Sequence, residues 1–202
     1  MAATLGALTF AEYATGSRTR RTEIVATRRI PPEDYVGAQY YAPLLEAIPV
    51  ALASMDPAAV LTVAAQGLEL SGQERAYAEA SAGLLRWWRR ASGVVVPAGE
   101  SVMETGGLRI DVTPHLAYRT RTGTEVALFH LKEAELTRDT AIAAARLLQV
   151  CMLDLLPGAT PVVVDARRAK THRIPTQTNL VKLDAWLASQ ATAYMKHQAT
   201  TP

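Results

Sequence analysis

The chain has 202 residues, of which 49% are hydrophobic and 20% are charged. These proportions are typical of a chain that folds around a buried core, and the length suits one domain or one domain with an extension. The net charge is only +2, so overall charge gives no reason to expect a nucleic-acid-binding protein.

Cysteine usage and the lengths of the apolar runs exclude several further classes of protein. Cys151 is the single cysteine, which rules out an intramolecular disulfide, and with four scattered histidines it supplies too few ligands for a zinc site. No apolar run approaches the roughly 18 to 20 residues that span a bilayer. Near the N-terminus the basic residues follow the apolar stretch, the reverse of a secretory signal. We therefore expect a cytoplasmic protein that does not bind membranes.

The first part of the chain predicts a helical extension. Residues 1–30 are rich in threonine, alanine and arginine with weak periodicity, which indicates a mobile arm or a short element. Apolar residues recur at helical spacing over 40–48, and Pro49 is expected to kink or end that helix. Asp56, which precedes a proline, predicts the N-cap of another short helix. We assign residues 1–70 to a helical N-terminal part that packs on the core.

The segment that follows predicts the clearest helix of the chain. Ser71 and Glu74 have the spacing of a capping box, in which each side chain bonds to the backbone amide of the other residue. Apolar side chains then repeat on one face as far as Trp88, and the helix is expected to stop near Gly93. The pair Trp87 and Trp88 either packs in the core or offers a base-stacking surface.

The pattern next changes to that of β-strands. Residues 94–96 are a β-branched run typical of a strand. Two further strands, 101–105 and 108–118, flank Gly106–Gly107, a pair typical of a hairpin turn. After a second turn, residues 126–132 predict another strand.

The last part of the chain combines helices with a buried strand. Helical periodicity runs from Thr137 to residue 155, residues 161–165 are a short apolar run typical of a buried strand, and 181–197 is an amphipathic helix. The order helix, three strands joined by hairpins, helix, strand, helix predicts an α/β (α+β) fold. We expect residues 71–202 to form a mixed central sheet flanked by helices.

A carboxylate and an amine on neighbouring predicted strands indicate where chemistry takes place. A metal-dependent phosphodiesterase needs carboxylates that hold Mg²⁺ and a lysine near the attacked phosphate. Asp111 lies on one predicted strand and Lys132 on the next. His130 lies two positions before Lys132 and therefore on the same face, in the position where a second acid is expected.

The segments LRIDVTP, VALFHLK and PVVVDARR, in this order, resemble the PD-(D/E)xK superfamily. The resemblance is greatest to the nuclease domains of bacterial recombination helicases and covers roughly residues 72–170. Most of the chain is also similar to a group of uncharacterised actinobacterial proteins, in which a helical part ending in a stretch like GLLRWWRR precedes the same strands. The resemblance implies a restriction-endonuclease-like core with a helical N-terminal part.

The resemblance also implies roles for individual residues. Asp111 matches the metal-binding aspartate of the superfamily, and Lys132 matches its lysine. Glu100 or Glu104 is the match for the additional glutamate that many members carry, and the metal would be Mg²⁺ or Mn²⁺. His130 departs from the pattern, because a neutral imidazole is a poor ligand for Mg²⁺.

Positive residues are concentrated in the N-terminal part and in a segment after the strand at 161–165. Such clusters either contact phosphates or lie in solvated loops. The second cluster is the expected contact surface for nucleic acid, DNA or RNA, through Arg167, Arg168, Lys170 and Arg173.

Two functions are compatible with these residues, and a third alternative is an oligomerisation or structural role in which the helix face of Tyr77, Leu84 and Trp88 packs on a partner chain. In the first, the nuclease-like core is a scaffold that binds nucleic acid or a protein partner with weak or no catalysis, because His130 has replaced an acid. In the second, the chain is an active metal-dependent nuclease that uses Asp111, Lys132 and one of the two glutamates, with His130 as an unusual ligand or base and Mn²⁺ better than Mg²⁺. Structural roles are the alternative for each residue: Asp111 capping a turn, Lys132 facing solvent and His130 hydrogen-bonded within the fold.

Overall fold

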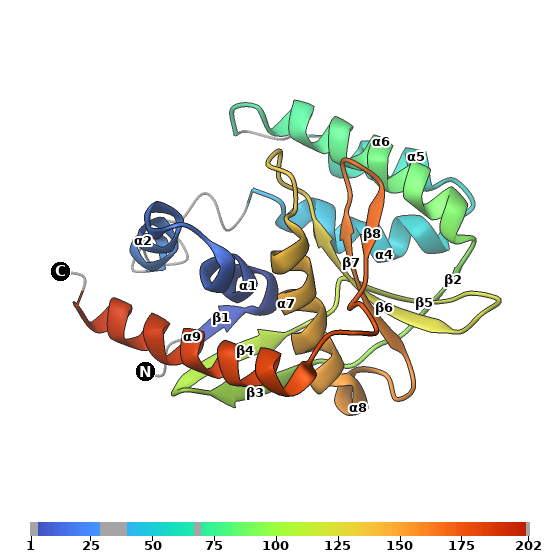
Figure 1. Cartoon of the computed structure of the whole chain (residues 1–202). Helices are drawn as coiled ribbons and strands as arrows, with labels where there is room; N and C mark the ends of the chain where they lie inside the picture. The colour runs from blue at the N-terminus through green and yellow to red at the C-terminus, as the bar shows by residue number, and fades with distance from the viewer. Residues whose placement is uncertain (1–3, 29–39, 67–69, 201–202) are drawn as a thin grey trace.

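The computed structural model describes residues 4–28, 40–66 and 70–200 (Figure 1). It confirms a mixed α/β fold, and none of the helices within those ranges is both long enough and apolar enough to cross a membrane. In chain order the elements are β1 (Thr4–Gly6), α1 (Ala7–Thr15), α2 (Arg18–Thr27), α4 (Ala42–Ala53), α5 (Pro57–Ala64), α6 (Gln73–Ala91), β2 (Val94–Val96), β3 (Ser101–Thr105), β4 (Leu108–Val112), β5 (Leu116–Arg119), β6 (Thr124–His130), α7 (Arg138–Val150), α8 (Met152–Leu155), β7 (Thr160–Asp165), β8 (Lys170–His172) and α9 (Leu180–Thr200).

The strands form two mixed sheets where one central sheet was expected. One sheet has the order β1-β4-β3 and the other the order β2-β5-β6-β7-β8. The strand predicted over 108–118 is interrupted between β4 and β5, because Pro114 has no amide hydrogen for a sheet. His115 restores the pairing: its amide donates to the carbonyl of Ala127 at 3.0 Å, and its Nδ1 accepts from the amide of Phe129 at 2.8 Å.

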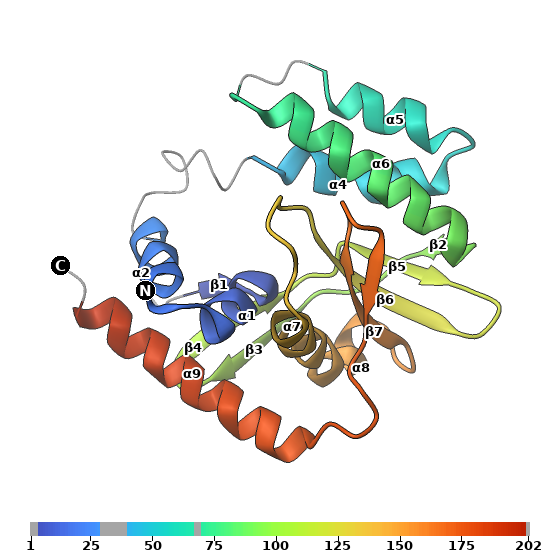
Figure 2. The same cartoon turned by 45° about the horizontal axis from the view of Figure 1, so that its top comes forward.

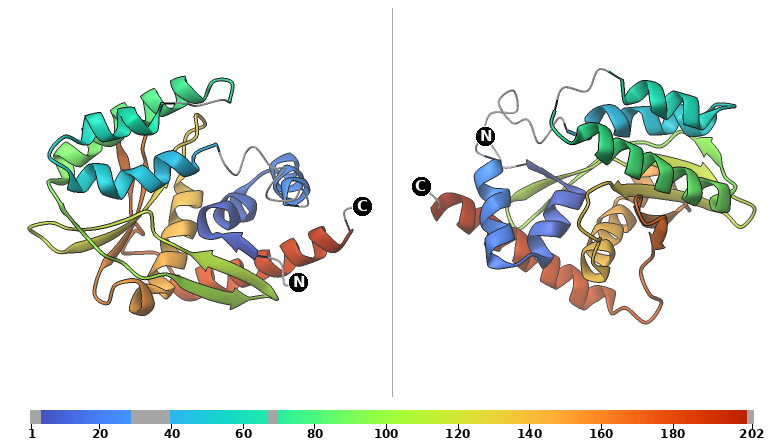
Figure 3. Two further views of the ribbon diagram at one scale, coloured as in Figure 1. Left: turned by 180° about the vertical axis from the view of Figure 1, so that it is seen from behind. Right: turned by 90° about the horizontal axis from the view of Figure 1, so that it is seen from above.

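The centre of the larger sheet is buried on both faces. β6 and β7 pair in parallel through the crossover helix α7, and their side chains alternate between two cores. Leu128 and Val163 face the core that includes α1, α7 and α9, whereas Phe129 and Val162 face the core that includes α4, α5 and α6. Figures 2 and 3 show these two groups of helices on opposite sides of the sheet.

Residues 4–28 are part of the core, which corrects the expectation of a mobile arm or one short element. β1 pairs in parallel with β4, so that Gly6 lies beside Asp111. Phe10 and Ala11 of α1 are fully buried, and α1 packs against α7. The weak periodicity of this segment therefore hides a strand and two helices.

The helix expected to kink or end at Pro49 does not end there. It continues to Ala53, because Ala51 and Leu52, which follow the proline, are buried. The capping box at Ser71 does not form: α6 begins at Gln73 after Gly72, whose φ is 74°. The buried Gln73 side chain instead donates to the carbonyl of Tyr40 at 2.8 Å, which ties the start of α6 to the chain before α4.

A glycine sets how closely α6 approaches the larger sheet. A Cβ on Gly83 would lie 2.0 Å from the carbonyl oxygen of Ala166 and 2.6 Å from that of Arg167. Both atoms belong to the turn between β7 and β8, so the helix can rest directly on this turn only because residue 83 has no side chain.

Candidate functional site

A cavity of about 470 Å³ opens beside α1, α2 and the ends of β4 and β6. The residues singled out in the sequence, Asp111, His130 and Lys132, all line it, together with Glu12 of α1 and Arg20 of α2. We call it the Glu12 cavity. The chain thus brings the predicted catalytic residues to one cavity, although β4 and β6 belong to different sheets.

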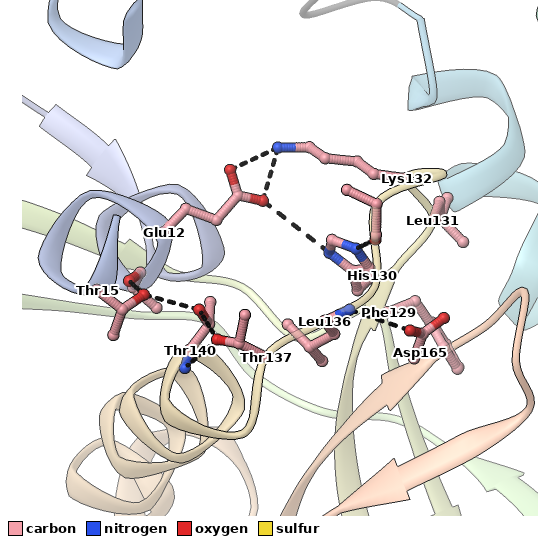
Figure 4. Close-up of polar contacts among 12 residues, drawn as sticks. Glu12, Thr15, Phe129, His130, Leu131, Lys132, Leu136, Thr137, Thr140 and Asp165 are labelled. Carbon is pink, nitrogen blue, oxygen red and sulfur yellow. Dashed lines mark hydrogen bonds and ion pairs between the residues drawn. The ribbon is translucent and has the colours of Figure 1, made fainter. Parts of the chain in front are cut away.

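Glu12 is the centre of the polar contacts in this cavity (Figure 4). The Nζ of Lys132 lies 2.6 Å from both carboxylate oxygens of Glu12, and Nη2 of Arg20 lies 2.7 Å from Oε2. Only 12% of the Glu12 side chain is exposed. Burial opposes its ionisation, but Lys132 and then Arg20 outweigh this effect, so the pKa of Glu12 lies below its ordinary value.

The turn between α1 and α2 explains why Arg20 reaches Glu12. A Cβ on Gly16 would lie only 2.6 Å from the carbonyl oxygen of Glu12, so glycine permits the close approach of the two helices. Ser17 then caps α2 by accepting from the amide of Arg20 at 3.3 Å. The second helix therefore begins beside the carboxylate of the first.

His130 is the last residue of β6, and only 6% of its side chain is exposed. Its Nε2 lies 2.7 Å from the carbonyl oxygen of Ala134. Because a carbonyl can only accept, Nε2 carries the hydrogen. Nδ1 lies 4.0 Å from Oε1 of Glu12. Nε2 of His130 is thus hydrogen-bonded to the backbone, and Nδ1 faces the Glu12 carboxylate, which is paired with Lys132 and Arg20.

Lys132 lies beyond the strand in which it was predicted. β6 ends at His130, and the loop that follows is held by Asp165 at the end of β7. The fully buried Asp165 accepts from the amide of Leu136 at 3.1 Å and from Nη1 of Arg168 at 3.2 Å. Figure 4 shows the side chains of Lys132 and His130 both directed towards Glu12 from this side of the cavity.

Asp111 takes no part in the ion pair of Lys132 with Glu12, which we call the clamp. Its side chain is 46% exposed and lies 3.8 Å from Nε of Arg109. Glu100 and Glu104, the predicted additional glutamates, do not line the Glu12 cavity; Glu104 lies on β3 opposite Arg109. Asp111 therefore shares a cavity with Lys132, without a direct contact to it, and does not share it with Glu100 or Glu104.

The arrangement does not fit the metal that the resemblance implies. Among the described residues, no three histidine, cysteine, aspartate or glutamate side chains are close enough to hold a metal ion. Mg²⁺ needs an octahedral set of oxygen ligands, and the best-placed carboxylate, Glu12, is already neutralised by two cations. The residues that line this cavity therefore do not form a site for Mg²⁺.

Glu12 is the residue that the sequence analysis missed. It belongs to a segment expected to be peripheral, and only the fold brings it near Lys132. A signal was nevertheless present, because Glu12 is the one charged residue in the run from Ala7 to Ala14, which is apolar apart from Glu12 and Thr9.

Most of the predicted nucleic-acid-binding residues line a second cavity, of about 650 Å³. Arg168, Lys170 and Arg173 border it together with Arg90 of α6. We call it the Lys170 pocket. Among the described residues, none lines both this pocket and the Glu12 cavity.

Arg167 is directed elsewhere, and only 10% of its side chain is exposed. Its guanidinium donates to the carbonyl of Leu131 at 2.8 Å, to Glu79 of α6 at 2.5 Å and to the hydroxyl of Tyr41 at 3.1 Å. These contacts join the loop after β6 to α6 and to the start of α4. In this structure Arg167 is thus a bridge between elements.

Comparisons with known proteins do not assign a family. No protein-family model matches the chain, and no curated protein matches it. The resemblance to the PD-(D/E)xK superfamily therefore stays a prediction, and the functional inference depends on the geometry of the two cavities.

Proposed function

We propose that this protein is a nuclease-like scaffold that binds nucleic acid with weak or no catalysis. The observation that carries the proposal is the clamp on Lys132, whose ammonium contacts both carboxylate oxygens of Glu12 at 2.6 Å. A lysine that assists phosphodiester hydrolysis must face the attacked phosphate or water. Here its charge is already compensated by an almost buried acid.

The surroundings of the clamp support weak or no catalysis. His130 takes the place of an acid, and its Nε2 is held by the backbone of Ala134. Of the three acids predicted to bind metal, Asp111, Glu100 and Glu104, only Asp111 lines the cavity. The ion pair of Lys132 with Glu12 holds the loop after β6 against α1, which is a structural role.

Nucleic acid is the favoured partner because of the charge in the Lys170 pocket. Four cationic side chains and one carboxylate, Glu125, line that pocket. Such a local excess of positive charge attracts phosphates even when the net charge of the whole protein is small.

Binding assays test this proposal. We expect labelled single-stranded DNA, duplex DNA or RNA to bind at about 50 mM salt and to dissociate as salt rises towards about 200 mM. The same complexes, incubated with Mg²⁺ or Mn²⁺, should keep their nucleic acid intact. If no nucleic acid binds at the lower salt concentration, the proposal of nucleic-acid binding is wrong, and a scaffold for a protein partner is the alternative that is left.

An active metal-dependent nuclease is the second candidate, favoured by the shared cavity of Asp111, His130 and Lys132. It requires Glu12 to release Lys132 when substrate binds. It predicts cleavage that is faster with Mn²⁺ than with Mg²⁺, since Mn²⁺ accepts imidazole more readily. Cleavage that persists in Lys132→Ala would exclude this candidate.

A further inference from the structure

The Lys170 pocket combines cations from separate elements. Arg90 comes from the last turn of α6, whereas Arg168, Lys170 and Arg173 come from the β7–β8 turn, β8 and the residues after it. Figures 1 and 2 show the end of α6, β8 and the β5–β6 hairpin in the same part of the molecule. Side chains distant in sequence thus border one recess.

The one carboxylate in the pocket is already compensated. Glu125 is 15% exposed, and it accepts from Nη2 of Arg173 at 2.7 Å and from the hydroxyl of Tyr118. The pKa of Tyr118 is raised, mainly by burial and to a smaller extent by this hydrogen bond. The hydroxyl of Tyr118 therefore stays protonated and donates to Glu125. The remaining cations therefore act on a ligand without opposition from Glu125.

Arg90 and Lys170, two of the cations in the pocket, have different partners. Arg90 donates to the backbone carbonyl of Ala169 and has no acidic partner among the described residues. Lys170 lies 3.5 Å from Glu135, and both side chains are more than half exposed. An exposed pair of this kind contributes little, so a phosphate can displace Glu135 from Lys170 at small cost.

The floor of the pocket favours contact with phosphates over contact with bases. Trp87 is only 3% exposed, and its Nε1 donates to the hydroxyl of Thr171 at 2.9 Å. Its ring is therefore not free to stack on a base. Because the Thr171 oxygen accepts from the indole, its own hydrogen is available to a ligand.

From this combination we infer that the Lys170 pocket binds phosphate groups of single-stranded nucleic acid, an inference that rests on the proposed function. A flexible strand can bend into a recess between a helix and a hairpin. A duplex is stiffer over the same length and adapts less to such a recess. Recognition is through Arg90 and Lys170, because Arg173 is paired with Glu125 and Arg168 with Asp165, and it is independent of base sequence.

A pair of charge-reversal variants tests the inference. Lys170→Glu alters the pocket, and Lys182→Glu makes the same change at an exposed position on α9 that lines neither cavity. Fluorescence anisotropy with a labelled oligothymidylate and with a duplex of equal charge would be recorded from about 50 to 200 mM salt. Arg90→Gln serves as a second pocket variant, because it removes the positive charge and keeps an amide donor at this position. Melting temperatures check that each variant is folded.

The inference predicts that the wild type binds the single strand about fivefold or more tightly than the duplex. It further predicts that Lys170→Glu weakens single-strand binding about tenfold and Arg90→Gln about threefold, each with a shallower salt dependence, whereas Lys182→Glu changes it less than about threefold. Equal losses of affinity in Lys170→Glu and Lys182→Glu, or a preference for the duplex, would show that the Lys170 pocket is not the binding site for single strands. Such a result would leave nucleic-acid binding by the protein intact. A wild type that binds neither oligonucleotide would overturn the proposed function as well.

Discussion

Lys132 and Glu12 are 120 positions apart in the chain, yet the ammonium of one lies 2.6 Å from each carboxylate oxygen of the other. The contact joins α1 to the loop after β6, so the residue that resembles a catalytic lysine connects two parts of the fold. Its energetics can be measured without knowing any ligand.

A double-mutant cycle of Glu12→Gln and Lys132→Met should show coupling between the two side chains. Lys132→Met leaves a nearly buried carboxylate with Arg20 as its remaining cation, so we expect the free energy of unfolding to fall by about 1 to 2 kcal/mol. The coupling energy, obtained from urea denaturation, should be about 1 kcal/mol. The exposed pair of Lys170 and Glu135 is the control and should show coupling near zero. Similar values for both pairs would show that the clamp is no stronger than a surface contact.

The pH dependence of stability should change in Glu12→Gln. The pKa of Glu12 in the folded protein lies below the ordinary value of 4.5, so its contribution is fully present above that value and is lost as the pH falls through the folded pKa. The difference in melting temperature between wild type and Glu12→Gln should therefore shrink below about pH 4.5. A difference that stays constant from pH 7 to pH 3 would contradict the ion pair.

His115 should make the fold sensitive to mildly acidic solution. Burial lowers the pKa of His115 from 6.5 to about 4, and its Nδ1 must stay unprotonated to accept from the amide of Phe129. The folded state binds fewer protons than the unfolded state in this range, so stability is full above pH 6.5 and falls between pH 6.5 and pH 4. The full shift corresponds to roughly 3 kcal/mol; since His115 keeps part of its solvent contact, we expect a loss of about 2 kcal/mol.

Urea denaturation of His115→Gln at pH 7 and pH 5 isolates this contribution. The glutamine carbonyl can replace Nδ1 as the acceptor, but it does not titrate. The variant should therefore lose less stability than the wild type between the two pH values. An identical loss in both proteins would mean that His115 titrates normally.

Gly83→Ala should destabilise the protein, although the same change in most exposed helices is stabilising. The new Cβ would meet the backbone carbonyls of Ala166 and Arg167, which cannot move without shifting the β7–β8 turn. We expect a loss of about 2 to 4 kcal/mol in urea denaturation. Ala82→Gly, at an exposed position of the same helix, is the control and should cost about 1 kcal/mol. A more stable Gly83→Ala would show that α6 does not rest on this turn.

Local patterns predicted most of the elements from residue 94 onwards. The hairpin at Gly106–Gly107, the helix after Thr137 and the strand over 161–165 depend on turn residues and periodicity, and each lies where it was expected. The break at Pro114 was not predicted, although the missing amide hydrogen was visible in the sequence. Propensity alone does not say where a long strand divides between two sheets.

The candidate site was only partly predictable, because some of its residues are far apart in the sequence. Asp111 and Lys132 could be placed near each other because their strands are close in the sequence. Glu12 could not, because the parallel pairing of β1 with β4 joins segments that no local pattern connects. Its role as the partner of Lys132 follows from the packing of α1 on the core.

The measurement that tests the central claim most directly is a calorimetric titration of the wild type with Mn²⁺, alongside Asp111→Asn. The carboxylate of Glu12 is paired with Lys132, and no three suitable metal ligands lie close together in the described part of the chain. We therefore predict that neither protein binds Mn²⁺ saturably with one-to-one stoichiometry. Bound oligonucleotide should also remain intact in the presence of the metal. Stoichiometric Mn²⁺ binding that Asp111→Asn abolishes, accompanied by cleavage, would contradict the scaffold and establish an active nuclease.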